Sequence, residues 1–327
     1  MTDKINSPWP KSYLLRCLFR WFDSSVRIDP AGEPDRKVQT AFPGKMYLAV
    51  HLVCLGVIWV GWSFTAMAVA LGLYLIRMLA ITGFYHRYFS HRTFSTSRFW
   101  QFCFAVLGNS AAQRGPLWWA AHHRHHHQYT DRKEDMHSPS QHGFWWSHIG
   151  WLTDPANFYT RMEYVRDWAK FPELVWLDRF DKVVPLVLAF SLYFGGEILA
   201  QYAPHLGTSG AQLVIWGFFI STVVLFHGTC TINSLSHMYG WRRFETPDTS
   251  RNNPILAIIT LGEGWHNNHH HYPISTRQGF FWWEYDITYY LLVVISWLGI
   301  IKNLRPVPEG VRRPGASHSL SQAPGSG

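Results

Sequence analysis

The sequence predicts an all-α integral membrane protein with four transmembrane helices arranged as two hairpins. Aromatic residues make up 17% of the 327-residue chain, whereas charged residues make up only 15%, below the roughly 25% typical of soluble domains. Long apolar runs also recur in pairs, and a short break separates the two runs of each pair. We therefore expect a chain that crosses a bilayer and turns back twice.

The first pair of apolar runs lies within residues 46–85. A single helix of that length would extend about 60 Å, twice the hydrocarbon core of a bilayer. A Gly-Trp-Ser tripeptide interrupts the run, so we expect two antiparallel spans, roughly 46–61 and 64–85. The second pair of spans, roughly 183–203 and 212–234, is separated by a connector that contains proline and glycine.

Lysine and arginine set the expected orientation. They are absent from the short connectors 61–63 and 204–211 but frequent in the first 45 residues and in segments 86–182 and 236–313. Because short cytoplasmic loops are enriched in these residues, we expect both termini and the segment 86–182 on the cytoplasmic side.

The predicted domain organisation has three parts. Residues 1–45 are polar and basic and are expected to form a cytoplasmic or interfacial segment. Residues 46–305 form the membrane domain, with 86–182 and 236–305 as its cytoplasmic parts. Residues 306–327 are rich in small residues, proline and glycine and are expected to be disordered. Three shorter apolar stretches are expected to be interfacial or packed helices: 12–22, 99–112 and 289–301.

Charge and cysteine content exclude two classes of function. The formal net charge is +8, but the basic residues are scattered and flank apolar runs, whereas nucleic-acid binders concentrate them on one face. We therefore expect a membrane and not a nucleic acid as partner. The four cysteines form no CxxC pair, which argues against a disulfide framework or a thiolate metal site.

Histidine is unusually frequent in this chain. There are 19 copies, and ten of them lie between His86 and His148. Side chains at i, i+3 and i+4 share one face of an α-helix, so HxxHH presents three imidazoles together. This pattern occurs in HHRHHH (122–127) and HNNHH (266–270). In HHRHHH the spacing allows two registers, one with His122, His125 and His126 and the other with His123, His126 and His127.

Two further patterns accompany these. NSLSH places Asn233 and His237 in line on a helix. The two histidines of HRYFSH (HxxxxH) do not share an α-helical face well, so this motif fits the end of a span, where the backbone can turn.

A cluster of protonated histidines would repel itself, so we expect neutral rings, which are metal ligands. About nine imidazoles with no suitable cysteine fit two metal ions. Imidazole suits several metals, but the membrane setting favours iron and oxygen chemistry on a lipid.

Together the motifs HRYFSH, WWAAHHRHHHQYTD, GFWWSHIGW, NSLSH and GEGWHNNHHHYP resemble the membrane fatty acyl-CoA desaturase family of the stearoyl-CoA type, over about residues 46–300. This resemblance implies four transmembrane helices under a cytoplasmic helical cap that holds two iron ions. It also implies the reaction, in which dioxygen is used to convert a saturated acyl chain, expected to be an acyl-CoA, to a cis-monounsaturated product with Δ9-type position.

The resemblance carries site residues over to this chain. The implied iron ligands are His86, His91, His123, His126, His127, His237, His266, His269 and His270, with Asn233 acting through a water. The implied lining of the acyl channel is Gln113, Trp119 and Thr229. The candidates for carboxylates that orient the ligands are Asp131, Glu134, Asp135 and Glu263. We expect at least two of these four to be ordinary solvated loop residues.

The chain departs from the family at the expected position of the acyl carrier. Animal members carry an Arg-Asp pair that contacts the CoA head, whereas this chain has Ala121-His122. The carrier could therefore be CoA, acyl-carrier protein or an intact lipid. Because the sequence has neither a haem-binding motif nor iron–sulfur cysteine spacing, we expect a separate electron donor, a ferredoxin or a b-type cytochrome with its reductase. We expect the bacterial inner membrane in preference to the endoplasmic reticulum.

Two alternatives compete with the desaturase hypothesis. A related membrane hydroxylase acting on alkanes, sterols or acyl chains has similar boxes, although its first box more often reads HxxxH. A metal transporter would place its ligands near the bilayer midplane, whereas these motifs lie at or beyond the cytoplasmic ends of the predicted spans.

Overall fold

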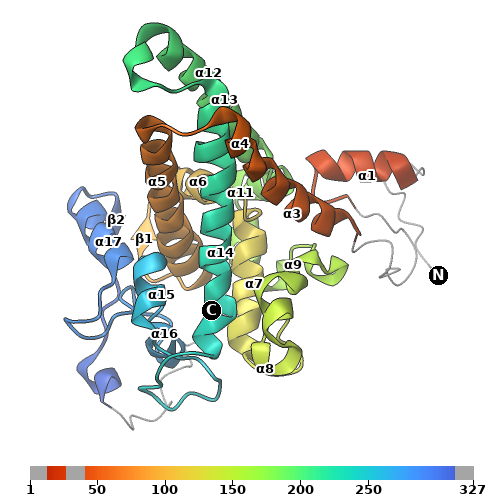
Figure 1. Cartoon of the computed structure of the whole chain (residues 1–327). Helices are drawn as coiled ribbons and strands as arrows, with labels where there is room; N and C mark the ends of the chain where they lie inside the picture. The colour runs from red at the N-terminus through yellow and green to blue at the C-terminus, as the bar shows by residue number, and fades with distance from the viewer. Residues whose placement is uncertain (1–12, 27–40, 314–327) are drawn as a thin grey trace.

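The computed structural model describes residues 13–26 and 41–313, and this part of the chain is mostly helical (Figure 1). The strands that it contains, β1 (Ser95–Thr96) and β2 (Ile301–Lys302), form a short antiparallel pair. The structure therefore confirms the prediction that the chain is mostly helical.

The first hairpin is built around the predicted break. Its elements are α3 (Ala41–Val53), the 3-10 turn η1 (Cys54–Gly56), α4 (Val57–Val60), α5 (Phe64–Leu79) and the π-helix η2 (Ala80–Ser90). Gly61 ends the first arm with a φ of +64°, a conformation that glycine adopts without strain. Ser63 then caps α5 by accepting a hydrogen bond from the Ala66 amide. The second arm extends to Ser90, beyond its predicted end at residue 85.

The second hairpin packs against the first. Its elements are α12 (Val183–Tyr202), η6 (Pro204–Leu206), α13 (Gly210–Leu213), the π-helix η7 (Val214–Ile220), α14 (Ser221–Asn233) and η8 (Leu235–His237). Gln212 joins the two hairpins, because its amide donates to the Val60 carbonyl at 2.9 Å and its carbonyl accepts from the Ser63 hydroxyl at 2.6 Å. Trp216 adds a third bond, from Nε1 to the Gly61 carbonyl at 2.8 Å.

Within the described residues, three helical runs are long and apolar enough to cross a membrane: Phe64–Ser90, Val183–Tyr202 and Gly210–His237. The apolar run Gly44–Val60 is shorter, as is Ile287–Trp297. The structure thus gives three membrane-spanning candidates where the sequence predicts four. The difference lies in the first predicted span, because the run Gly44–Val60 has only 17 residues and extends about 25 Å at 1.5 Å per residue.

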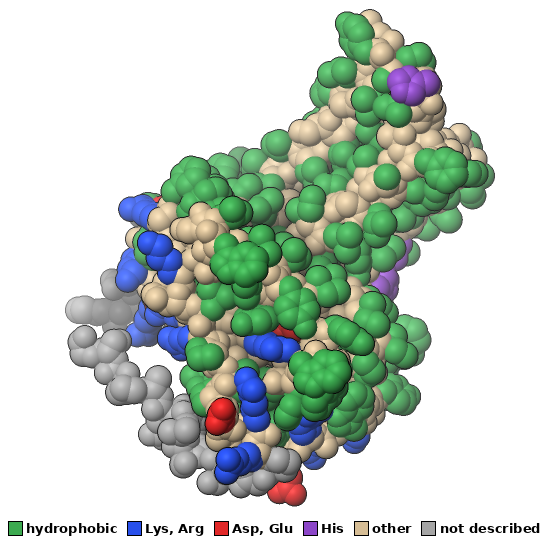
Figure 2. All heavy atoms as spheres, turned by 90° about the vertical axis from the view of Figure 1, so that its left-hand side faces the viewer, with side chains coloured by type: hydrophobic (Ala, Val, Ile, Leu, Met, Phe, Trp, Pro, Cys, Tyr) green, Lys and Arg blue, Asp and Glu red, His purple; other side chains and the backbone are tan. Residues whose placement is uncertain are grey.

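Apolar side chains cover the outside of these helices. Figure 2 shows hydrophobic atoms over the narrow upper part of the molecule, whereas lysine and arginine gather on the broader lower part. Exposed examples on the hairpins include Trp59, Phe64, Phe190, Phe194 and Tyr202. A continuous apolar exterior of this kind marks a surface that faces lipid or a partner.

The rest of the chain forms mostly short helices beside and below the hairpins (Figure 1). The segments expected to be interfacial or packed are helical: α1 (Tyr13–Phe22), α6 (Arg98–Asn109) and α17 (Ile287–Trp297). Along the chain, the segment that connects the two hairpins also contains α7 (Pro116–Tyr129), α8 (Pro139–His142), η3 (Trp146–Gly150), α9 (Trp151–Thr153), η4 (Pro155–Asn157), η5 (Met162–Tyr164), α10 (Arg166–Ala169) and α11 (Pro172–Arg179). After the second hairpin come α15 (Pro254–Ile259), α16 (His266–His271) and η9 (Glu309–Arg312).

The π-helix η2 is the centre of the core, and all of its residues are buried. It packs against α5, α6, α7 and α17. Phe84 stacks on Phe104 of α6 with ring centroids 3.9 Å apart, and Thr82 shares a 2.7 Å hydrogen bond with Thr288 of α17. Helix α17 is therefore a packed helix that supports the end of the second arm.

The packed part of the chain continues beyond residue 305, where the predicted membrane domain ends. Val307 and Val311 are buried against Phe244 and Phe280. The segment 306–313 thus contributes to a small apolar cluster, because its two valines lie four residues apart on one side of the turn η9. The remainder of the predicted tail, 314–327, lies outside the described residues, as do 1–12 and 27–40 of the N-terminal segment.

A glycine pair tests the packing of the second hairpin. A Cβ atom on Gly196 would lie 2.6 Å from the Gly210 backbone, whereas a Cβ on Gly195 would meet nothing within 4 Å. We expect Gly196→Ala to destabilise the protein by about 1–3 kcal/mol through overpacking. Gly195→Ala should leave stability unchanged or raise it by up to about 1 kcal/mol through helix propensity. Thermal unfolding in detergent measures both, and equal melting temperatures would contradict the close packing.

Candidate metal centre

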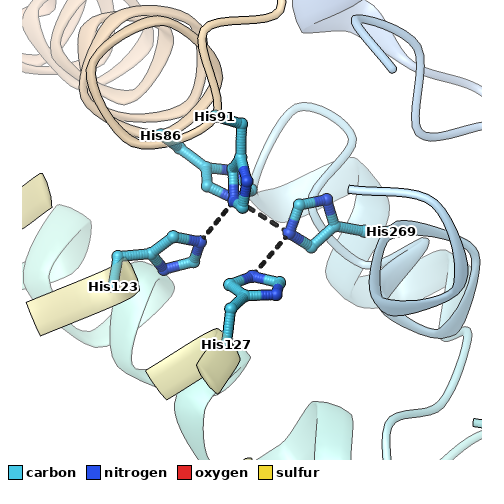
Figure 3. Close-up of side chains that lie close together, drawn as sticks. All are labelled: His86, His91, His123, His127 and His269. Atoms are coloured by element: carbon cyan, nitrogen blue, oxygen red, sulfur yellow. Dashed lines mark hydrogen bonds between the residues drawn. The ribbon is translucent and has the colours of Figure 1, made fainter. Parts of the chain in front are cut away.

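The structure gathers all nine of the predicted histidine ligands into two neighbouring groups. The first group contains His86, His91, His123, His127 and His269, and the second contains His126, His237, His266 and His270. Within each group the ligand nitrogen atoms lie within 4.8 Å of one another. Figure 3 shows the first group, with the rings converging from three separate parts of the chain.

The π-helix η2 explains how HxxxxH can act as a pair. In a π-helix each amide bonds to the carbonyl five residues earlier, and the His91 amide does bond to the His86 carbonyl at 3.2 Å. Residues five apart then lie nearly above one another, which an α-helix does not allow. The imidazole centroids of His86 and His91 are 4.9 Å apart. The sequence predicts a backbone change here but not its type.

Helices α7 and α16 supply six of the remaining seven histidines, and η8 supplies His237. On α7, His123 and His127 lie one turn apart and face the first group, while His126 faces the second. On α16, His269 belongs to the first group, and His266 and His270 belong to the second. Each HxxHH motif therefore contributes to both groups.

The structure selects one of the two registers allowed for HHRHHH. His122 and His125 are outside both groups, although both are buried. His122 bonds through Nδ1 to the Trp118 carbonyl at 2.9 Å and packs on the Trp118 ring. His125 packs between Tyr129 and Tyr164. Burial lowers the pKa of His122 to about 3 and that of His125 to about 4, so both are neutral packing residues.

The grouped imidazoles have the protonation state that metal ligands need. Burial, reinforced by the neighbouring histidines, holds the pKa of His91, His123 and His127 well below the ordinary value. The same causes lower the pKa of His266 and His269. These rings are therefore neutral at physiological pH and have a nitrogen lone pair free for a metal.

The nitrogen atoms are arranged as a metal would require. Nε2 atoms approach at 3.1 Å between His86 and His269, 2.8 Å between His91 and His123, and 3.1 Å between His237 and His266. Nε2 of His270 is buried without a hydrogen-bond partner. Orphaned buried donors or acceptors are costly, and a cation among these nitrogens would satisfy them. The all-nitrogen donor set suits iron among several transition metals.

Carboxylates hold the other ring nitrogen of four ligands. Glu263 lies 2.5 Å from His86 Nδ1, Asp135 lies 3.0 Å from His126 Nδ1, and Asp248 lies 3.0 Å from His270 Nδ1. Asp131 lies 3.5 Å from His237 Nδ1. A carboxylate at Nδ1 fixes the tautomer in which the Nε2 lone pair faces the group. The four orienting carboxylates are thus Asp131, Asp135, Asp248 and Glu263.

The carboxyl groups remain ionised in this setting. Burial raises the pKa of Asp135 and Asp248, but the adjacent histidines outweigh it and lower both pKa values. Burial also lowers the pKa of His126, but the charge of Asp135 outweighs it and raises that pKa. A metal at His126 would therefore compete with a proton, which makes metal binding dependent on pH.

The prediction about carboxylates needs two corrections. Three of the four candidates contact ligands, and only Glu134 is an exposed loop residue, so the expectation of two or more bystanders is wrong. Asp248 was not predicted, because no fixed spacing connects it to a histidine motif. It reaches His270 from a separate loop, and the only local signal in the sequence is the mostly polar segment TPDTS (246–250) in which it lies.

The predicted channel residues also lie close together beside the metal centre. A cavity is lined by Trp119, Thr229, Asn233 and, from the histidine groups, His86 and His123. Gln113 donates a hydrogen bond to the Thr229 hydroxyl at 2.9 Å. Apolar side chains of Met78, Ile81 and Ile232 complete one side of the cavity. The cavity is therefore lined both by apolar side chains and by imidazoles of the metal centre.

Comparison with known proteins decides the family. A family model described as fatty acid desaturase matches residues 60–293, more than half of the chain. The chain belongs to the fatty acid desaturase family. The histidine motifs on which the resemblance was based all lie within this match.

Similarity to individual desaturases extends over most of the chain. The sn-2 palmitoyl-lipid 9-desaturase of Nostoc sp. is 35% identical over 264 residues, which cover 79% of this chain and 87% of that protein. The sn-1 stearoyl-lipid 9-desaturase of Synechocystis sp. is 33% identical over 305 residues, covering 91% and 90%. An acyl-CoA 5-desaturase of Anemone leveillei is 34% identical over 268 residues, covering 81% and 78%.

Family membership makes this desaturase an oxidoreductase that acts on fatty acyl chains, as the sequence predicts. The hydroxylase and transporter alternatives are not favoured, because these relatives are all desaturases of acyl-lipids or acyl-CoA. Helices long and apolar enough to cross a membrane agree with a lipid substrate.

The register within HHRHHH can be tested by metal content. His127→Gln removes a nitrogen from the first group, so iron bound per chain should fall severalfold, whereas His125→Gln should bind as much iron as the unmodified protein. Elemental analysis of protein purified from iron-replete cells measures both. Because His125 is a packing residue, size-exclusion chromatography serves as the folding control. Loss of iron in His125→Gln with iron retained in His127→Gln would contradict the register.

The role of Asp248 can be tested in the same way. Asp248→Asn keeps the size of the side chain but removes the charge that faces His270 Nδ1. Iron affinity should fall by about 10–100-fold, measured by competition with a chelator. Glu134→Gln is the matched control, because this exposed carboxylate contacts no ligand, and it should leave the affinity unchanged. Equal affinities for the two variants would show that Asp248 does not orient the ligand.

Proposed function

We propose that this desaturase inserts a cis double bond at carbon 9 of a saturated fatty acyl chain at a pair of iron ions. The single observation that carries the proposal is the division of nine converging imidazoles into one group of five and one of four. A cavity with apolar walls opens directly onto both groups. A C–C bond of an acyl chain lying in this cavity would be adjacent to both metals.

Each group would hold one iron. The first iron would be bound by His86, His91, His123, His127 and His269. The second would be bound by His126, His237, His266 and His270, with Asn233 completing its coordination through a water. Asn233 supports this role because it lines the cavity next to His126 and His266.

The iron pair, when bound, supplies the chemistry that activates dioxygen for removal of hydrogen from two adjacent methylene groups. The protein's own residues position the acyl chain and exclude water. Trp119 and Thr229 would contact the chain beside the metals, and the Gln113–Thr229 hydrogen bond would fix the shape of the cavity wall. The orienting carboxylates keep the imidazoles in place during turnover.

We propose a membrane lipid as the acyl carrier. Ala121 and His122, which replace the charged pair expected to contact a CoA head, are buried on α7 and offer no charge at the surface. Relatives that act on acyl-lipids also match most of the chain. An acyl chain that remains on its lipid could enter from the bilayer without a carrier site in the aqueous phase.

The proposed topology has four spans with both termini and the metal centre in the cytoplasm, where the short helices form a cap. The fourth span would be the run Gly44–Val60, shorter than the others. Exposed basic residues such as Lys133, Arg242 and Arg305 would favour docking of an acidic electron donor, a ferredoxin or a b-type cytochrome.

Expression in a bacterial host tests the function. We expect a new monounsaturated fatty acid with its double bond at carbon 9, located by mass spectrometry after derivatisation. When cells are pulsed with a labelled saturated fatty acid, the labelled monounsaturated product should appear first in intact lipids. His127→Gln should abolish the product. A hydroxylated product without alkene would refute desaturation, and a double bond at another carbon would refute the proposed position. Earlier appearance of the labelled monounsaturated product in acyl-CoA than in intact lipids would refute the lipid carrier.

A further inference from the structure

Three histidines outside the metal centre form a continuous hydrogen-bonded chain. His51 is on α3, His227 on α14 and His148 on η3. His51 Nε2 lies 3.0 Å from His227 Nε2, and His227 Nδ1 lies 3.0 Å from His148 Nε2. His227 thus uses its two nitrogens for two different neighbours, one on each side of the ring.

Both ends of this chain finish on carbonyl oxygens. At one end His51 Nδ1 lies 2.8 Å from the Tyr47 carbonyl. At the other end His148 Nδ1 lies 2.9 Å from the Ser234 hydroxyl, which donates to the Cys230 carbonyl at 2.9 Å. A carbonyl only accepts hydrogen bonds, and two ring nitrogens bond to each other only when one of them carries a hydrogen. A fully hydrogen-bonded chain between the two carbonyls therefore needs one hydrogen atom in every link.

Counting these hydrogens gives the protonation state of the chain. Five links run from the Tyr47 carbonyl to the Cys230 carbonyl. Three neutral imidazoles and one hydroxyl supply only four hydrogens. One additional proton would complete all five links. It can reside on any of the three rings, and the hydrogen bonds between the rings reverse as it moves from one ring to the next. With every link made, the chain holds one excess proton that is shared among the three rings.

The surroundings of the three rings fit a proton carrier and not a metal site. Because His227 binds a different neighbour with each nitrogen, the three rings do not converge on a common point, and they are absent from the groups able to hold a metal. In the described chain no lysine, arginine or carboxylate contacts them. The other titratable groups nearby are Tyr47, whose hydroxyl lies 3.3 Å from His227 Nε2, and the Cys230 thiol, which interacts with Tyr47. Phe144 and Phe226 cover the rings.

The chain ends beside the metal centre. Ser234 is fully buried and follows Asn233, which lines the cavity. The Ser234 carbonyl accepts a hydrogen bond from the amide of His237, a member of the second histidine group, at 3.2 Å. Burial lowers the pKa of His148, so the ring next to Ser234 releases a proton readily.

We propose that His51, His227 and His148 form a proton relay that supplies the desaturation reaction through Ser234. This inference rests on the proposed function, whose reaction consumes protons. Two C–H bonds of adjacent methylenes break, a C=C bond forms, and dioxygen is reduced to two waters. Two of the four electrons come from the acyl chain and two from the external donor, so two protons must be supplied. Ionisable residues in membrane helices are costly and typically serve such transfers.

Turnover measurements on the iron-loaded enzyme test the relay. His227→Phe removes the central ring and fills its space, and His51→Gln cuts only the distal link. We expect His227→Phe to bind iron normally but to lower kcat on the order of 100-fold, as for loss of an acid–base group, with KM unchanged and an altered pH profile. His51→Gln should cause a smaller loss of the same kind. His205→Gln, a substitution in the exposed turn η6, is the control and should match the unmodified enzyme.

A second readout does not depend on activity. Metal-free protein labelled with ¹⁵N-histidine, in lipid nanodiscs, is titrated by NMR for the unmodified chain and for His227→Phe. We expect His51 and His148 to shift together on uptake of a single proton in the unmodified chain and separately in the variant. Independent titration of the three rings in the unmodified chain would overturn the shared proton.

The outcomes separate the two proposals. If the unmodified protein forms no alkene, the proposed function fails. If it is active while His227→Phe has the same kcat and pH profile, only the relay fails. Loss of iron in His227→Phe, with normal kcat in His51→Gln, would assign these histidines a structural role and would also overturn the relay.

Discussion

The hydrogen bond between a carboxylate and the Nδ1 atom of a histidine is the interaction on which this structure depends. Glu263, Asp135 and Asp248 each make it at a different ligand. Each bond turns one ring so that its Nε2 lone pair faces a shared space. Without such bonds, buried imidazoles would take either tautomer, and a compact metal site would not form reliably. Helices α7 and α16 and the π-helix η2 are placed so that these bonds are possible.

Buried charge of this kind needs further support, which the surrounding chain supplies. Arg87 of η2 lies 3.1 Å from Glu263 and 2.9 Å from Asp286, so it neutralises part of the negative charge near the first group. Asp286 also caps α17 by accepting from the Tyr289 amide. The helix that supports η2 from outside is thereby connected to the carboxylate that orients His86. The π-helix η2 is therefore stabilised both by its packing against α17 and by the ion pairs of Arg87.

Much of this arrangement could be predicted from sequence, for identifiable reasons. Periodicity places His266, His269 and His270 on one face of a helix, and local apolar runs reveal the hairpins. The register of HHRHHH could not be derived from spacing, because both registers satisfy it. It is decided by Trp118, whose ring and carbonyl hold His122 away from the ligands. Asp248 was missed because its contact with His270 joins segments 22 residues apart, and no local pattern encodes that approach.

The backbone type of η2 and the lengths of the spans were also beyond the sequence. A π-helix depends on a change of hydrogen bonding that apolar periodicity does not reveal, although HxxxxH at the end of a span indicates that something must change there. The apolar run Gly44–Val60, which covers most of the first predicted span, is shorter than the three runs long enough to cross a membrane. In the same region His51 and Tyr47 face α14, where they contact His227. Residues of this helix are therefore constrained by polar contacts as well as by lipid.

We propose that the two histidine groups hold two iron ions, one in each group. Metal analysis of the full chain, purified in detergent from iron-replete cells, tests it most directly. We expect two irons per chain and no stoichiometric zinc, with a Mössbauer spectrum that contains two high-spin iron sites rich in nitrogen ligands. One iron per chain, or zinc in its place, would contradict the claim.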